Sequence, residues 1–177
     1  MRTKKQLLPI DNRPAIVRCV ESILNSGVAD IVVVVNPEGN EIVRSLSEFP
    51  VAIAVNYSLE SDMAESVRVG LKVIGSFSTG VFICLSDHPL VASATLQAMG
   101  REHQARPDAI IIPMFHGRRG HPTLFPCHIL AELKKYSTLR DVISSDKDRI
   151  FFFDVADEGV VMDMDTPEEY QKILERC

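Results

Sequence analysis

The sequence predicts an α/β fold with a mostly parallel sheet, and two observations carry that prediction. Five apolar runs rich in β-branched residues are nearly continuous rather than alternating, which is typical of strands buried on both faces. Helix-like stretches lie between them, as in βαβ units. The 177 residues, 46% of them hydrophobic, suffice for one sizeable core. We therefore expect a single domain over residues 1–177.

Each element follows from local patterns. The expected strands are 31–35, 51–55, 81–85, 109–112 and 150–153, and the expected helices are 14–25, 64–74 and 94–105. Pro14 suits a first helical turn, and Gly27 lies just past the end of that helix. A last helix opens at Thr166, where a proline and two glutamates favour a first turn.

The net charge and the positions of the cysteines narrow the classes of partner and the cellular compartment. A formal charge of −5 argues against nucleic acid or an acidic membrane surface, and no apolar stretch is long enough to span a bilayer, so a small-molecule partner is favoured. The four cysteines show no metal-ligand spacing and follow no amino-terminal signal segment, a reducing, cytoplasmic pattern. We expect each cysteine to be a small buried hydrophobe rather than a redox or ligand residue.

Polar residues directly after strands are the first candidates for function, because ligands of open α/β sheets bind beyond the carboxyl ends of the strands. Asp87 follows the strand 81–85 and has no basic neighbour within its motif, Ser-Asp-His-Pro-Leu. A carboxylate at the mouth of a buried strand is costly without a cation, and a metal ion would satisfy it. A turn or N-cap aspartate explains this stretch equally well.

A second acidic segment precedes the last helix. Asp163 and Asp165 are two residues apart in extended chain, so their side chains point to the same side. With Asp87 they would form an oxygen-rich site of the kind that Mg²⁺ shares with substrate phosphates. The alternative is that Asp165 caps the last helix, which would still leave one oxygen for a metal.

Basic residues offer phosphate contacts. The stretch 117–122, Gly-Arg-Arg-Gly-His-Pro, combines Arg118 and Arg119, whose guanidinium groups match phosphate oxygens, with glycines that allow close backbone approach. The alternative is a solvated hairpin tip, with His121 as a hydrogen-bonding loop residue.

Further candidates lie in the first half of the chain. Lys5 precedes an apolar Leu-Leu-Pro, and Asn56 ends a strand. Ser66 and Arg68 lie near the start of the following helix, where backbone amides and the dipole attract anions. For Arg68 the alternative is a surface helix residue.

Five short pieces, in order, resemble the MobA-like NTP transferases, and the likeness is greatest to their molybdenum cofactor cytidylyltransferase branch. The pieces are 5–9, Asn56 with 63–71, 85–90, 117–122 and 160–169. The resemblance covers essentially the whole chain. It implies a Rossmann-like, three-layer fold of the nucleotide-diphospho-sugar-transferase type, an NTP substrate and Mg²⁺.

The resemblance also implies roles for individual residues. Asp87 matches a metal-binding aspartate, Asp165 the carboxylate that completes the metal site with Asp163 close by, and Lys5 the lysine that neutralises the NTP phosphates. Asn56, Ser66, Arg68, Arg118, Arg119 and His121 are the expected substrate and phosphate contacts. The attacking phosphate oxygen is already anionic, so neither His88 nor His121 is needed as a general base.

The chain departs from the family at its amino terminus. Family members begin with a strand leading into a Leu-Ala-Ala-Gly-x-Ser-x-Arg-Met-Gly loop, and Met1 falls at the methionine of that motif. The nucleotidyltransferase domain is therefore expected to be amino-terminally truncated relative to the family. In the family that strand normally lies in the middle of the sheet, so we expect one of three explanations for its loss. The true start of the protein lies upstream of Met1, another chain fills the gap as in a homo-oligomer, or the protein is a degenerate copy that no longer turns over.

The expected activity is Mg²⁺-dependent transfer of CMP from CTP to the phosphate of molybdopterin, with release of pyrophosphate. Transfer of GMP from GTP is the second choice of nucleotide. One alternative is a non-catalytic carrier that hands the molybdenum cofactor to a molybdoenzyme or its chaperone. Another is a sugar-phosphate nucleotidyltransferase, which usually carries longer acceptor-binding regions.

Overall fold

The structure, a computed structural model, describes residues 4–58 and 62–177. Its four longer helices form at the expected places: α1 (Ala15–Asn25), α3 (Met63–Leu71), α4 (Ser93–Ala105) and α7 (Pro167–Leu174). The shorter elements are α2 (Asn40–Ser45), α5 (Cys127–Leu130), α6 (Leu139–Ser144), and the 3-10 turns η1 (Lys5–Leu7), η2 (Ala131–Lys134) and η3 (Glu158–Val161). The α/β class is confirmed.

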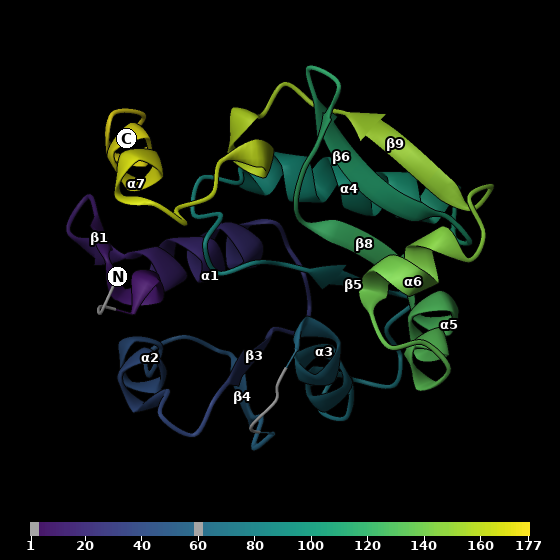
Figure 1. The fold of residues 1–177 in the computed structure, drawn as a ribbon, viewed down its shortest axis with the longest axis horizontal. Coiled ribbons are helices and arrows are strands. Elements are labelled where there is room, and N and C mark those ends of the chain that lie inside the picture. Colours follow the sequence, from purple (N-terminus) through teal and green to yellow (C-terminus); the bar gives the residue numbers. More distant parts are fainter. Residues whose placement is uncertain (1–3, 59–61) are drawn as a thin grey trace.

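The described strands form three separate sheets. The largest contains β5 (Gly80–Ile83), β8 (Thr123–Pro126), β6 (Ile110–Phe115), β7 (Arg118–Arg119) and β9 (Ile150–Asp154). A two-stranded sheet contains β3 (Val32–Val35) and β4 (Ala52–Val55), and β1 (Pro9–Ile10) pairs with β2 (Arg13–Pro14) in a hairpin. Figure 1 shows β3 and β4 set apart from β5.

The pairing is more mixed than the sequence indicates. β3 is parallel to β4 and β6 is parallel to β9, but β8 lies antiparallel between β5 and β6. β8 was not among the expected strands because its four residues, Thr-Leu-Phe-Pro, follow one proline and end in another, and they give no usable periodicity. All four are buried, so β8 occupies the interior of the larger sheet.

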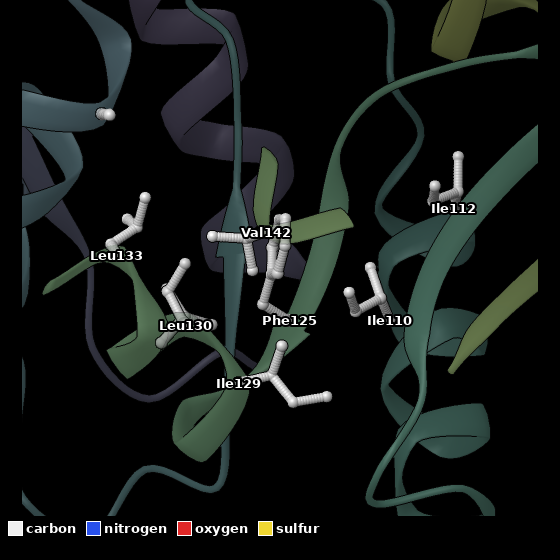
Figure 2. Packing of buried hydrophobic residues seen from close by; sticks show 9 residues of the cluster. Ile110, Ile112, Phe125, Ile129, Leu130, Leu133 and Val142 are labelled. Carbon is white, nitrogen blue, oxygen red and sulfur yellow. The ribbon is translucent and has the colours of Figure 1, made fainter. Parts of the chain in front are cut away.

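The main core lies between the larger sheet and the helices that cover it. Phe125 of β8 and Ile110 and Ile112 of β6 pack against Leu130, Leu133 and other apolar side chains of the segment that follows β8 (Figure 2). A smaller cluster joins Ile10 of β1, Ala15 of α1, and Met164 and Ile173 at the carboxyl terminus. This second cluster fixes the two ends of the chain against each other.

An open, largely apolar cavity of about 460 Å³ separates the two-stranded sheet from the larger one. Its walls come from β3, β5, α1 and α3. We name this cavity the inter-sheet slot.

Two of the cysteines are exposed. Cys84, just after β5, lines the inter-sheet slot and is exposed, and Cys177 is exposed as well. The expectation of a buried cysteine is therefore confirmed for Cys19 and wrong for Cys84 and Cys177, because one opens into the slot and the other ends the chain.

No helix in the described parts of the chain is both long and apolar enough to cross a membrane.

Candidate functional site

The candidate site lies where β5 ends and both chain ends approach it. The turn after β5 carries Asp87, η1 carries Lys5, and the stretch between η3 and α7 carries Asp163 and Asp165. Met164, between the two aspartates, is fully buried, so both carboxylates flank an apolar anchor. Tyr170 of α7 adds a hydrogen bond from its Oη to the carbonyl oxygen of Pro9, at 2.5 Å. These contacts position the two acids beside the amino-terminal segment.

Lys5 forms an ion pair with Asp165, with Nζ 2.5 Å from Oδ1. The hydrogen bond to Asp165 raises the pKa of the lysine above its ordinary value, and the charges of Asp165, Asp87 and Asp163 act in the same direction. The ammonium group therefore faces three carboxylates that come from two distant parts of the chain. The structure thus brings Lys5 and the three candidate acids close together.

Asp87 has a neighbour that the sequence reasoning missed. Nδ1 of His88 lies 3.0 Å from Oδ1 of Asp87, and the His88 ring is buried. This contact lowers the pKa of Asp87, and the charge of Lys5 adds to the effect. The statement that Asp87 lacks a basic neighbour within its motif is therefore wrong: consecutive side chains point apart in a strand, but these two residues lie in a turn.

Asp163 is an acid whose ionised form is disfavoured in the folded chain. Burial raises its pKa above the ordinary value and the negative charges of Glu169, Asp165 and Asp87 raise it further, while the charge of His88 acts in the opposite direction. An acid whose ionised form is disfavoured by other acids gains from a nearby cation. Over residues 4–58 and 62–177, however, no group of three or more His, Cys, Asp or Glu side chains is arranged as a preformed metal site. Any metal here would need ligands from substrate.

His121 lies beside His88, with ring centroids 5.1 Å apart in an edge-on arrangement. Its backbone N–H donates to the carbonyl oxygen of Val160, which ties the 117–122 stretch to η3. Burial lowers the pKa of His121, and the neighbouring His88 acts in the same direction. Its Nδ1 is buried and has no hydrogen-bond partner among the described residues. The ring is thus positioned next to the Asp87 turn.

Arg118 and Arg119 occupy the exposed β6–β7 hairpin. Their strand pairs with the end of β6, and Gly117 has a positive φ of 77° in the tight turn. The guanidinium of Arg119 lies 4.7 Å from the ring centre of Phe152 on β9. No contact within the described residues joins either arginine to Asp87. This geometry matches the solvated hairpin tip, and the phosphate-binding role stays a prediction.

Asn56 and Ser66 form a second polar group. Asn56 is buried at the end of β4, and its Nδ2 lies 3.2 Å from Oγ of Ser66 in α3. Arg68 faces elsewhere: its guanidinium donates to the carbonyl oxygens of Leu133 and Tyr136 and pairs with Glu65. Arg68 therefore anchors α3 to the segment after β8. Neither alternative for Arg68, a phosphate contact or a plain surface residue, anticipated that role.

The start of α7 corrects one alternative. Thr166 is its N-cap, with Oγ1 accepting from the Glu169 N–H, while the Glu169 carboxylate accepts from the Thr166 N–H. The reading of Asp165 as the cap is wrong, because Thr166 supplies the capping oxygen. Asp165 is left to pair with Lys5.

An α/β fold with a lysine and three carboxylates at the carboxyl end of a strand is typical of enzymes that handle nucleotide phosphates. The model of the MobA-like NTP transferase domain matches residues 1–150. The chain belongs to this family and is a nucleotidyltransferase by that membership. No curated protein sequence matches it significantly.

Solved structures show the same fold at low sequence identity. Rv0371c from Mycobacterium tuberculosis H37Rv is 24% identical, with a TM-score of 0.81, and the match covers 99% of this chain and 90% of that one. A nucleotidyl transferase from Methanothermobacter is 18% identical (TM-score 0.81; 98% and 85% covered). The 4-diphosphocytidyl-2C-methyl-D-erythritol synthase from Anaerococcus prevotii is 14% identical (TM-score 0.74; 97% and 92% covered). The nucleotide-diphospho-sugar-transferase type of fold is thereby confirmed.

Proposed function

We propose that this nucleotidyltransferase moves CMP from CTP to the phosphate of molybdopterin or a molybdenum-bearing form of it. The observation that carries the proposal is the convergence of Lys5, Asp87, Asp163 and Asp165 at the end of β5. In this reaction an acceptor phosphate oxygen forms a bond to the α-phosphorus of CTP. The bond from that phosphorus to the bridging oxygen breaks, and pyrophosphate leaves with the electron pair.

The chain's residues supply alignment and positive charge rather than a base. The attacking oxygen is already anionic, so no side chain has to remove a proton from it. Lys5 can neutralise charge on the departing pyrophosphate, since its ammonium group pairs with Asp165 and feels the charges of Asp87 and Asp163. His88 holds Asp87 ionised and oriented through its 3.0 Å contact. The His121 ring packs edge-on against His88 and so supports the Asp87 turn.

The donor set fits Mg²⁺. Asp163 carries a negative charge that its surroundings disfavour, and Asp87 is held ionised beside it. Magnesium is commonly bound by one or two carboxylates together with substrate phosphates, so a preformed three-ligand cage is not needed. When bound, Mg²⁺ would neutralise phosphate charge. A structure of the mycobacterial protein Rv0371c is a complex with manganese, which supports testing a divalent cation here.

The choice of CTP over GTP is supported by two structures of the same fold. One is the diphosphocytidyl-methylerythritol synthase, and the other is a CMP:2-keto-3-deoxy-manno-octonic acid synthetase complexed with CTP (11% identity, TM-score 0.74). Both names also favour a second candidate function, nucleotidyl transfer to a sugar or sugar phosphate. What supports molybdopterin is the resemblance of the 117–122 and 160–169 stretches.

The test is pyrophosphate release by the natural full-length polypeptide. It is mixed with Mg²⁺, with CTP or GTP, and with molybdopterin or a panel of phosphorylated sugars. We expect release with CTP and molybdopterin that stops when EDTA is added. If pyrophosphate is released with a sugar phosphate and not with molybdopterin, the acceptor is the sugar phosphate. Binding of molybdopterin without any release would favour the non-catalytic carrier and contradict the proposal.

A further inference from the structure

The outer strand of the larger sheet, β9, has one open edge. Within residues 4–58 and 62–177 it pairs with β6 alone, in parallel, from Ile150 opposite Ile110 to Asp154 opposite Met114. Figure 1 shows β9 at the outer side of the sheet, beyond β6. The strand β5 lies at the opposite edge, so the open edge of β9 is distinct from the inter-sheet slot.

The register of β9 identifies the backbone groups that face its open edge. The carbonyl oxygen of Arg149 accepts from the Ile110 N–H, and the Val155 N–H donates to the carbonyl oxygen of Met114. In a regular strand the N–H and C=O of one residue point to one edge, and those of the next residue point to the other. The odd-numbered residues therefore face β6. The even-numbered residues direct their backbone groups to the open edge: Ile150, Phe152 and Asp154.

The side chains of β9 lack the features that normally protect an edge strand. Natural edges carry charged residues, prolines or bulges that block pairing with another chain. Residues 150–153 read Ile-Phe-Phe-Phe, and Phe152 is 41% exposed although the guanidinium of Arg119 lies over its ring. Phe151 and Phe153, on the other face, pack against buried core residues. The edge is therefore apolar and unblocked.

We propose that β9 is the interface of a symmetric dimer, in which it pairs antiparallel with β9 of a second copy about a two-fold axis at Phe152. Each of the two Phe152 N–H groups donates to the carbonyl oxygen of the other. The Asp154 N–H of each copy donates to the open carbonyl oxygen of Ile150 in the other. The Ile150 N–H needs no partner, because it donates to the carbonyl oxygen of Lys147 in its own turn. The two larger sheets become one continuous sheet.

The arrangement of β9 favours a second copy over an unrelated strand, because it is symmetric about Phe152. The groups that face the open edge lie at residues 150, 152 and 154, so a two-fold axis at the middle residue sets each group opposite one that can bond to it. The same axis sets Phe151 opposite Phe153 of the second copy. Aromatic cross-strand pairs of this kind stabilise antiparallel strands.

The charges around β9 favour the same register. With the axis at Phe152, no like charges lie directly opposite one another in the paired strands. With the axis at Phe151, Asp148 would lie opposite Asp154, and like charges in that position are destabilising. In the proposed register Asp154 of the second copy lies on the face that carries Arg119, so the charges on that face are opposite in sign across the axis.

The test is sedimentation velocity of the natural full-length polypeptide over a range of concentrations. We expect a reversible equilibrium between monomer and dimer. Phe152→Lys puts a charge on the axis and should raise the dissociation constant of the dimer at least about 100-fold. Phe77→Lys is the matched control, because Phe77 is 96% exposed and lies between α3 and β5; it should leave the dissociation constant unchanged. No nucleotide or acceptor is present, so the result is independent of the proposed reaction.

Amide hydrogen exchange locates the contact and needs no substituted protein. As the wild-type concentration rises through dimer formation, the amides of Phe152 and Asp154 should exchange at least about tenfold more slowly. Segment 123–126, in the interior of the larger sheet, serves as the control and should not change. This measurement still decides the matter if Phe152→Lys does not fold.

Three results would overturn the proposal. The first is a protein that stays monomeric at every concentration. The second is a dimer that Phe77→Lys weakens as much as Phe152→Lys does. The third is protection that rises at 31–35 and 80–85 instead of at residues 152 and 154, which would place the interface at the inter-sheet slot.

Discussion

The larger sheet and the two-stranded sheet differ in how completely each is packed. The larger sheet buries β8 between β5 and β6 and has fully buried side chains such as Ile110, Phe125 and Leu130. The β3–β4 pair packs on α1 and α2 through Leu46 and Val33, and its other edge borders the open inter-sheet slot. The stable framework of the molecule is therefore the larger sheet, and Asp87 is attached to it.

This difference divides the candidate site into two parts. Asp87, Asp163 and Asp165 depend on β5, Met164 and α7, which belong to the larger sheet or pack at the chain's ends. Asn56 and Ser66 belong to the less completely packed side. The predictions below test that contrast.

The largest expected effect is on folding stability, through a matched pair of substitutions. Leu130→Ala and Leu46→Ala remove the same atoms from fully buried positions in the two halves. We expect Leu130→Ala to cost about 4–5 kcal/mol and Leu46→Ala about 2–3 kcal/mol, since Leu46 packs with Ile16 and Val20, which line the slot and can relax. Urea denaturation measures both. Equal losses of unfolding free energy, or a larger loss for Leu46→Ala, would contradict the difference in packing between the two sheets.

The second prediction concerns Asp163, the acid whose pKa is raised in the folded chain. In metal-free buffer Asp163→Asn should melt higher than the wild type, because it removes a carboxylate whose pKa is raised in the folded state. With Mg²⁺ and CTP at about 100 times Kd, the wild type should gain about 2.7 kcal/mol. The variant should lose most of that gain, so the order of the melting temperatures reverses. An equal gain in both proteins would contradict a cation site at Asp163.

The third prediction uses the two neighbouring lysines. The pKa of Lys5 is raised, so its pair with Asp165 stabilises the fold fully below the ordinary lysine pKa and loses that effect as the pH rises through the higher folded value. Both partners are partly exposed, and we expect Lys5→Met to cost at most about 1 kcal/mol at pH 7. The loss should shrink above pH 11.

Lys4→Met is the control for that experiment. Lys4 pairs with Glu41 on the two-stranded side, away from the three acids of the candidate site. The melting temperature of each variant, measured from about pH 7 to about pH 12, separates the two. A Lys5→Met loss that does not change with pH would mean that packing, and not the ion pair, holds η1 in place.

The smallest expected effect concerns the β6–β7 hairpin. Arg119→Ala removes the contact with Phe152 and should cost about 0.5–1 kcal/mol of stability. If the hairpin also binds acceptor phosphate, the variant's KM for acceptor rises while kcat changes little. An unchanged KM would establish the hairpin as a solvated tip. Melting curves and steady-state kinetics measure the two effects separately.

The sequence predicted the elements with strong periodicity and the acids at strand ends, but not contacts set by turns. Continuous Val and Ile runs located β3, β5 and β6, and Thr166-Pro167 located α7. β8 was missed because a strand of four residues that follows one proline and ends in another shows no periodicity. The Asp87–His88 contact and the tethering of Arg68 depend on turn geometry and on a partner segment 65 residues away, which no local pattern records.

The most direct measurement compares pyrophosphate release by Asp87→Asn and by Asp108→Asn in the natural full-length polypeptide. Asp108 is a largely exposed aspartate on the surface, so it controls for the substitution itself. With CTP, Mg²⁺ and molybdopterin, we predict that Asp87→Asn lowers kcat at least about 100-fold while the circular dichroism spectrum is unchanged. Asp108→Asn should keep the wild-type rate. A folded Asp87→Asn protein that releases pyrophosphate as fast as the wild type would contradict the proposed site.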